Sequence, residues 1–189
     1  MKSVQLPDMD KPAGDATAHR LTYSDGLSRV VYTTENELPY PDGKLIVSRV
    51  DLDGIITHAN DAFVDISGYS RDELIGAPHH ILRHPQMPKA AFKDLWQTVE
   101  AGKKWHGYVK NLCKDGSYYW VYATAVPNIR HGETVGYTSV RRKPSRSLPK
   151  LGETLRSGSN KGPILSAHSH LIWPGNGHPA FFIATEPPG

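Results

Sequence analysis

The chain has 189 residues, of which 38% are hydrophobic and 22% charged, a composition that suits one globular domain with additional segments. No apolar run approaches the roughly 18–20 residues that cross a bilayer, and the first residues lack the apolar core of a secretion signal, so we expect a cytoplasmic protein without a membrane span. The single cysteine, Cys113, excludes an internal disulfide and a metal site built from several thiolates.

Positive charge is concentrated near the C-terminus. Residues 1–140 carry 15 Lys and Arg against 17 Asp and Glu, a net −2, whereas residues 141–189 carry 7 against 2, a net +5. A basic segment of this kind can bind nucleic acid or a membrane surface. Solvated tails of modest charge are far commoner, so we expect no nucleic-acid partner.

The two ends of the chain lack a regular apolar pattern. Residues 144–189 contain 7 Pro and 6 Gly, 13 of 46 residues, close to the roughly 25–30% typical of disordered segments. The N-terminal residues are polar and interrupted by Pro and Gly. We therefore predict a flexible segment over 1–37, one folded domain over 38–143 and a disordered basic tail over 144–189.

The first half of the folded region predicts two strands followed by three helices. Residues 44–60 contain two apolar runs joined by an Asp-Gly dipeptide, which favours a hairpin turn. A short helix is expected to begin near Asn60, and a second begins at Ser70, whose capping box is completed by Glu73. A longer helix is predicted over 88–102, where apolar residues recur at i, i+3, i+4 and i+7.

The second half of the folded region predicts strands only. Apolar alternation over 105–114, 117–129 and 134–142, interrupted by turn residues, indicates an antiparallel meander. Strands and helices that do not alternate along the chain are typical of the α+β class. We therefore predict a five-stranded antiparallel sheet with helices on one face and a pocket between the two layers.

Two stretches of the folded region are similar to a known family. The first is DLDGIITHANDAFVDISGYSRDELIGAPHHILRHPQMPKAAFKDLW, and the second combines WHGYVKN with KDGSYYWV. From about Leu38 to Lys143 the chain resembles a PAS domain, and more narrowly the FAD-binding PAS domain of bacterial aerotaxis receptors. The resemblance implies a PAS fold that binds FAD non-covalently and senses redox state or oxygen without catalysing a reaction. We see no membrane anchor or signalling helix in the sequence, so we expect the domain to act through a signalling partner or as a PAS homodimer.

The strand over 105–111 carries residues suited to a flavin ring. Alternation places Trp105, Gly107 and Asn111 on one face, which we expect to be the inward face. A buried amide without partners costs on the order of 1–3 kcal/mol, and the Asn111 amide can donate and accept, so it bonds either nearby backbone or the polar edge of a ring. The resemblance implies the flavin contact. Trp105 is expected to wall the ring or to pack in the core, and Gly107 to let the ring approach the sheet.

Three further residues are candidates through the same resemblance. Asn60 precedes a predicted helix and suits an N-cap, and the family pattern suggests that it also touches the flavin. Trp96 lies on the apolar stripe of its helix, where it packs in the core or against the cofactor. His58, two residues before Asn60, completes the set.

Basic residues before the helix over 88–102 suggest an anion site. A guanidinium such as that of Arg83 forms bidentate bonds to phosphate, and the N–H groups at the start of a helix add positive potential. The same spacing also occurs in basic surface loops, but the resemblance implies that Arg83 and His84 contact the FAD pyrophosphate or ribose. Family members tend to carry Asp where this chain has Gln86, which caps a helix less well but can still hydrogen-bond.

Three alternatives to this interpretation stay open. A light-sensing flavin domain needs a cysteine on a helix beside the ring, whereas Cys113 follows a predicted strand. A haem-binding PAS gas sensor would find axial ligands among His79, His80 and His84. A cofactor-free PAS domain would serve only in dimerisation or partner docking.

Overall fold

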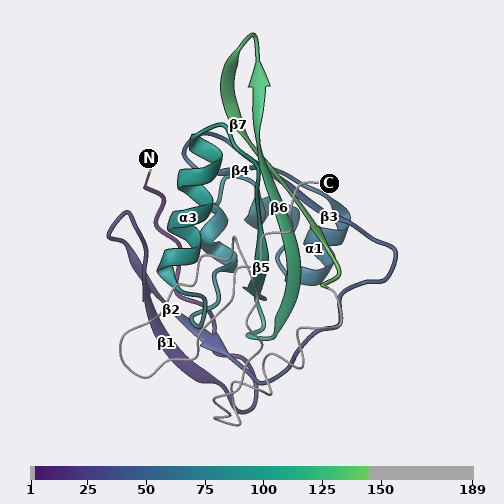
Figure 1. Cartoon of the computed structure of the whole chain (residues 1–189). Helices are drawn as coiled ribbons and strands as arrows, with labels where there is room; N and C mark the ends of the chain where they lie inside the picture. Colours follow the sequence, from purple (N-terminus) through teal and green to yellow (C-terminus); the bar gives the residue numbers. More distant parts are fainter. Residues whose placement is uncertain (1–2, 145–189) are drawn as a thin grey trace, which may run out of the picture.

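A five-stranded antiparallel sheet forms the centre of the molecule (Figure 1). The structure is a computed structural model that describes residues 3–144, so the predicted disordered tail lies outside the described residues apart from Pro144. The strand order is β4-β3-β7-β6-β5. The strands are β3 Ile46–Val50, β4 Ile56–Ala59, β5 Trp105–Leu112, β6 Tyr118–Arg130 and β7 Glu133–Arg142. The predicted α+β fold with a five-stranded antiparallel sheet is therefore confirmed, and each of the five strands lies where the sequence predicts it.

The turn between β3 and β4 explains why these two short strands pair. The Asp51 carboxylate accepts hydrogen bonds from the backbone N–H groups of Asp53 (3.0 Å) and Ile55 (2.9 Å). Gly54 has φ +80°, a left-handed conformation that glycine adopts without strain. A side chain there would also lie 3.3 Å from the Trp96 ring. The turn thus brings β3 and β4 close to the helix that carries Trp96.

The helices begin where the sequence predicts them. They are α1 Asp61–Ser67, α2 Arg71–Leu74, the 3₁₀ helix η1 His79–Leu82 and α3 Lys89–Glu100. Asn60 caps α1, and the capping box of Ser70 and Glu73 opens α2. Pro88 occupies the N-cap position of α3 rather than its first turn. The helix η1 was not predicted, because four residues are too few to show a period.

The prediction of a flexible segment over 1–37 is wrong for residues 17–33. Strands β1 Thr17–Thr22 and β2 Ser28–Thr33 form an antiparallel hairpin, whose turn is held by the Asp25 carboxylate accepting from the Leu27 N–H (3.0 Å). Its apolar face forms a small core with a residue of β5: Leu21, Tyr23, Val31 and Leu112. The hairpin is stable because Leu112 of β5 completes its core. This contact joins residues far apart in the chain, so the local sequence pattern does not reveal it.

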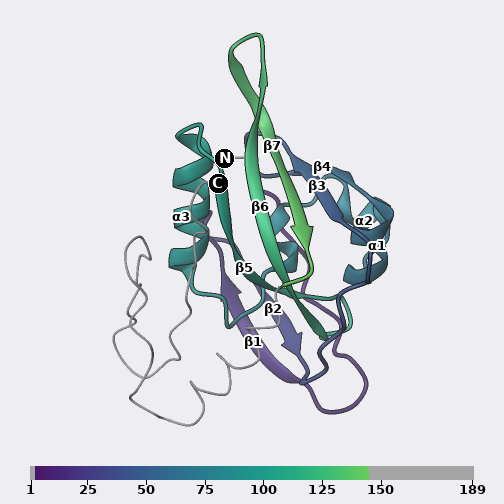
Figure 2. The same cartoon turned by 45° about the vertical axis from the view of Figure 1, so that its right-hand side comes forward.

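The two hairpins lie at opposite ends of the molecule. The β1–β2 hairpin, drawn in purple, is at one end, and the long β6–β7 hairpin projects beyond the rest of the sheet at the other (Figures 1 and 2).

Of the helices between residues 3 and 144, none has the length and hydropathy needed to cross a bilayer. The main apolar core lies between the helices and the inner face of the sheet, where Phe63, Leu74 and Val121 are fully buried.

Candidate functional site

A cavity of about 660 Å³ opens between α3 and the sheet. Its volume falls within the roughly 300–1,000 Å³ typical of sites for small molecules and cofactors. The floor is formed by β3, β5, β6 and β7, one wall by η1 and α3, and another by the loop of the β1–β2 hairpin. Three layers of the fold therefore contribute side chains to one site.

Short side chains on the sheet make room for the cavity. Ser48 of β3 pairs with Ser139 of β7, and Ser139 pairs in turn with Ala125 of β6. Ala123, two residues earlier on β6, pairs with Arg141. Because Ser and Ala fill little of the space above a sheet, α3 packs against the rim of this face and leaves its centre open.

Aromatic side chains of α3 line the wall opposite the sheet. Trp96 and Phe92 are both half-buried and both line the cavity. The Trp96 ring contacts Tyr137 edge to face, with ring centroids 5.5 Å apart. The Arg83 guanidinium lies 5.2 Å above the Phe92 ring, a cation–π distance. A flat aromatic ligand would meet apolar surfaces on this side.

The hairpin loop closes a further side of the cavity. Tyr23, Ser24 and Asp25 line it, and the Tyr23 ring stacks on His80 with centroids 3.8 Å apart and 14° between planes. Burial lowers the pKa of His80 to about 4, although the carboxylate of Asp25 opposes this effect. Sequence reasoning missed the three hairpin residues, Tyr23, Ser24 and Asp25. Their signal was the Asp25-Gly26 turn between two weakly alternating segments.

A polar cluster of Ser48, His79 and Arg141 lies at the floor of the cavity. The Arg141 Nη2 donates to Nε2 of His79 (2.6 Å) and to Oγ of Ser48 (3.0 Å). Because a guanidinium only donates, His79 is neutral and carries its proton on Nδ1. Burial and the charge of Arg141 lower the pKa of His79 to about 3. Ser48 and Arg141 were not predicted as site residues, since Arg141 follows an ordinary strand pattern.

Several buried polar atoms at the cavity lack a hydrogen-bond partner. Within residues 3–144 these include Nε of Arg83, Nδ2 of Asn111, Nη1 of Arg141 and Nε2 of His80, all on residues that line the cavity. The first three are donors. Buried donors without acceptors are costly, so their concentration at one cavity indicates a ligand that supplies acceptors. Carbonyl oxygens, ring nitrogens and phosphate oxygens of a flavin nucleotide fit this donor set.

Three of the predicted cofactor residues line the cavity: Arg83, Trp96 and Asn111. Asn111 is 5% exposed on the inward face of β5, as alternation predicts. Burial raises the pKa of the Tyr119 hydroxyl, and nearby Asn111 opposes this effect. Neither the Tyr119 hydroxyl nor Nδ2 of Asn111 has a hydrogen-bond partner of standard geometry. A backbone bridge between Arg83 and Asn111 ties the basic loop to the floor.

His84 and Gln86 lie outside the cavity, unlike Arg83 in the same loop. The buried His84 ring accepts from the Gln86 N–H through Nδ1 (3.2 Å) and contacts the Tyr118 ring edge to face. Gln86 is exposed and accepts from Nζ of Lys110 (2.7 Å). Burial lowers the pKa of His84 to about 3, which makes it a poor counter-charge for phosphate. Both side chains hold the loop in place.

Trp105 and Gly107 occupy the expected face of β5 but do not line the cavity. Nε1 of Trp105 donates to the Asp94 carboxylate (2.8 Å), which ties β5 to α3. A Cβ at Gly107 would lie 2.5 Å from the Trp105 ring. The space above this glycine is therefore filled by an indole of the same strand, and not left open for a ligand ring.

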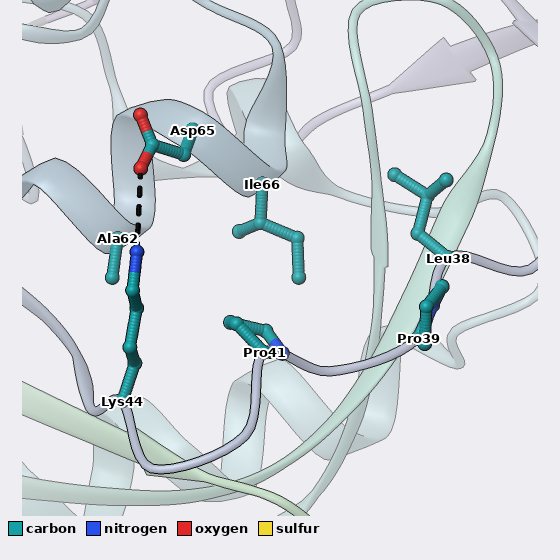
Figure 3. A pocket seen from close by; sticks show the side chains of 7 residues that line it. All are labelled: Leu38, Pro39, Pro41, Lys44, Ala62, Asp65 and Ile66. Atoms are coloured by element: carbon teal, nitrogen blue, oxygen red, sulfur yellow. Dashed lines mark ion pairs between the residues drawn. The ribbon is translucent and has the colours of Figure 1, made fainter.

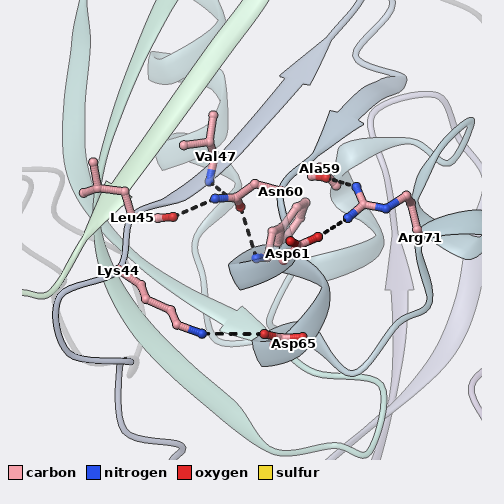
Figure 4. A network of polar contacts seen from close by, with 9 residues as sticks. Lys44, Leu45, Val47, Ala59, Asn60, Asp61, Asp65 and Arg71 are labelled. Atoms are coloured by element: carbon pink, nitrogen blue, oxygen red, sulfur yellow. Dashed lines mark hydrogen bonds and ion pairs between the residues drawn. The ribbon is translucent and has the colours of Figure 1, made fainter.

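Asn60 and His58 also lie away from the cavity. The Asn60 Oδ1 accepts from the N–H groups of Phe63 (3.2 Å) and Val47 (3.0 Å), and its Nδ2 donates to the Leu45 carbonyl (2.8 Å; Figure 4). These contacts use Oδ1 twice and one N–H of Nδ2, so the role of the amide is to cap α1 and join it to β3. His58 is exposed on β4.

A second hollow lies outside α1, with a volume of about 250 Å³ (Figure 3). Lys44 and Asp65 form an ion pair at its edge (3.8 Å), and its lining residues carry no buried polar atom without a partner. Cys113 lines neither cavity. Its thiol donates to the Ile66 carbonyl, and burial raises its pKa to about 12, which leaves it unreactive.

The fold and the cavity define a small α+β domain with a cavity enclosed between helices and an antiparallel sheet. Comparison with known families narrows this class, because residues 56–141 match the family described as the PAS fold. Residues 56–141 of the chain are a PAS domain.

The chain is similar to two larger regulatory proteins. It is 46% identical over 136 residues to the aerotaxis receptor of Escherichia coli (strain K12), which covers 72% of this chain and 27% of the receptor. It is 31% identical over 112 residues to a nitrogen fixation regulatory protein of Klebsiella pneumoniae, with coverage of 59% and 22%. The chain therefore spans about a quarter of the length of these relatives.

Solved structures support the fold. The dark structure of the light-oxygen-voltage domain of the blue-light photoreceptor Aureochrome1 has a TM-score of 0.50 and 22% sequence identity, and covers 60% of this chain and 83% of that chain. A light-oxygen-voltage domain studied with a flavin analogue has a TM-score of 0.50 and 23% identity, with coverage of 60% and 85%. At these identities the likeness concerns the arrangement of strands and helices.

Proposed function

We propose that this PAS domain binds FAD in the cavity beneath α3 and acts as a redox or oxygen sensor of the aerotaxis type. The observation that carries the proposal is a set of buried donors on Arg83, Asn111 and Arg141. These donors have no acceptors among the described residues, and all three residues line a cavity of cofactor size. The similarity to the E. coli aerotaxis receptor supports the same function.

In this proposal the residues of the chain divide the cofactor between them. Asn111 and the floor of the sheet hold the ring, with Trp96 and Phe92 forming an apolar wall. Arg83 holds phosphate oxygens through charge-assisted hydrogen bonds. When bound, the flavin supplies reversible electron transfer, and the protein itself catalyses no reaction.

The proposed output runs through β5 and β6. Asn111 lies on the inner face of β5 and pairs with Tyr119 of β6, whose neighbour Trp120 lies on the other face of the sheet. A change in the hydrogen bonds of the Asn111 amide would thus shift a strand that reaches the outer face, where a cytoplasmic signalling partner or a second PAS domain binds.

The absorption spectrum of the purified full chain tests the proposal. We expect an oxidised-flavin spectrum and release of FAD, identified by mass, on heat denaturation. Asn111→Ala should weaken FAD binding about tenfold, which corresponds to one lost hydrogen bond of about 1.4 kcal/mol. The matched control is Asn36→Ala, at an exposed loop position outside the cavity.

Two results would overturn the proposal, and a third would correct the role of Asn111. A colourless protein that takes up no FAD on refolding would favour a cofactor-free docking or dimerisation domain. A Soret band would favour haem, with the unpartnered Nε2 of His80 as the candidate axial ligand. Equal FAD affinity in the parent and in Asn111→Ala would remove the amide from the site.

A further inference from the structure

Arg141 is a buried cation without a counter-charge. Its side chain is 3% exposed, and no carboxylate among the described residues forms an ion pair with it. Its guanidinium lies 5.1 Å above the ring of Phe63, which offsets only part of the lost hydration. A buried, unpaired charge destabilises a fold, so an arginine at such a position indicates a group that neutralises it from outside the chain.

Two neighbours fix the orientation of this guanidinium. Ser48 and His79 accept from one terminal nitrogen, Nη2, at 3.0 and 2.6 Å. The other terminal nitrogen, Nη1, is buried and has no partner, on a residue that lines the cavity. Because His79 is held neutral, the cluster carries a single positive charge. The arrangement is a preoriented donor at the cavity floor.

The two cavity arginines lie on different walls. Arg83 follows η1 beside α3, whereas Arg141 belongs to β7 in the sheet. Phosphate suits a half-buried rim position because it stays partly hydrated. The deeper, 3% exposed Arg141 suits an acceptor that already belongs to an apolar ring. The two guanidiniums can therefore read different parts of one ligand.

We propose that Arg141 binds the imide edge of a heteroaromatic ring, with Ser48 and His79 as its positioning residues. An imide offers carbonyl oxygens flanking a ring N–H, and these oxygens supply the acceptors that Nη1 of Arg141 and Nδ2 of Asn111 lack. The inference rests on the proposed function, in which the imide is the pyrimidine edge of FAD.

A comparison of FAD with riboflavin isolates the ring contact, since riboflavin has the same ring without phosphates. Apoprotein of the full chain would be titrated with each ligand, and quenching of flavin fluorescence followed. We expect R141Q to weaken the binding of both ligands by the same factor, on the order of tenfold. R83Q should weaken FAD and leave riboflavin unchanged. R141K, which keeps the charge but loses the planar fork, should lie between R141Q and the parent.

The control variant is R142Q. Arg142 is the next residue on β7, but it is exposed and lies over the Tyr122 ring on the other face of the sheet. It should bind both ligands as the parent does. A second measurement is the thermal unfolding of the apoprotein. R141Q should unfold at or above the parent temperature, because it removes an unpaired buried charge.

The possible outcomes separate this inference from the proposed function. A parent chain that binds neither flavin overturns both. A parent that binds FAD while R141Q retains both affinities overturns the role of Arg141 alone. If R141Q lost FAD binding but kept riboflavin binding, Arg141 would contact phosphate, which contradicts the imide contact. A marked drop in apoprotein melting temperature for R141Q and R141K would make the arginine a structural residue and also overturn the inference.

Discussion

The ring of Tyr23 stacks on the ring of His80, with centroids 3.8 Å apart. This contact joins the β1–β2 hairpin to η1 and makes the hairpin one wall of the cavity. We therefore predict that Tyr23→Ala lowers the free energy of unfolding by about 3 kcal/mol, through loss of a buried ring and a stacked pair. Urea unfolding would measure this change.

The control for Tyr23→Ala is Tyr32→Ala on the same hairpin. Tyr32 is half-buried and contacts neither His80 nor the cavity. Its removal should cost less than that of Tyr23 and leave FAD affinity unchanged. Equal losses of stability in the two variants would show that the stack contributes nothing specific.

The buried histidines predict that stability falls at acid pH. Burial lowers the pKa of His79 and His84 to about 3 and that of His80 to about 4, from 6.5. The unfolded chain therefore takes up protons first as the pH falls below 6.5, and each histidine removes up to about 1.4 kcal/mol per pH unit. The neutral histidines therefore do not reduce the free energy of unfolding above about pH 7, and the loss of stability grows as the pH falls towards 4.

Urea unfolding between pH 4 and 8 would measure this dependence. His84→Asn keeps an acceptor for the Gln86 N–H but does not titrate, so it should reduce the slope below pH 6.5 by about a third. Above pH 7 the slopes of the parent and the variant should coincide. A parent whose stability is flat from pH 7 to 4 would contradict the burial of neutral histidines.

Asn60 is predicted to stabilise the fold and not to bind the cofactor. Asn60→Ala removes the N-cap of α1 and the bonds to Val47 and Leu45, at a cost of about 2 kcal/mol. Asn36→Ala, at an exposed loop position, is the matched control. The FAD affinity of the folded fraction should be unchanged. An Asn60→Ala protein of parental stability and weakened FAD binding would restore the role that the resemblance implies.

Gly107 is predicted to be needed by Trp105. A methyl group at this position would lie 2.5 Å from the indole and would break its bond to Asp94, so Gly107→Ala should cost about 1–3 kcal/mol and shift the tryptophan fluorescence. In a Trp105→Leu background the same change should cost much less. A cost that is the same in both backgrounds would assign the effect to the strand backbone.

Much of the fold follows from local signals in the sequence. The alternation in β5, the capping box of Ser70 and Glu73 and the apolar stripe of α3 each act over a few residues, so these elements can be predicted without tertiary structure. The β1–β2 hairpin could not be predicted in this way, because its few apolar residues become a stable core only against Leu112.

The same division holds for the site. The sequence by itself determined the PAS resemblance, the inward face of Asn111 and the basic loop at Arg83. Only the tertiary structure decided which of these side chains reach the cavity. Backbone caps and packing hold Asn60 and Trp105 elsewhere, while strand pairing brings Arg141 under the cavity beside Ser48 and His79. A cavity is made by residues far apart in sequence, so its donors appear only when the strands and the hairpin are in place.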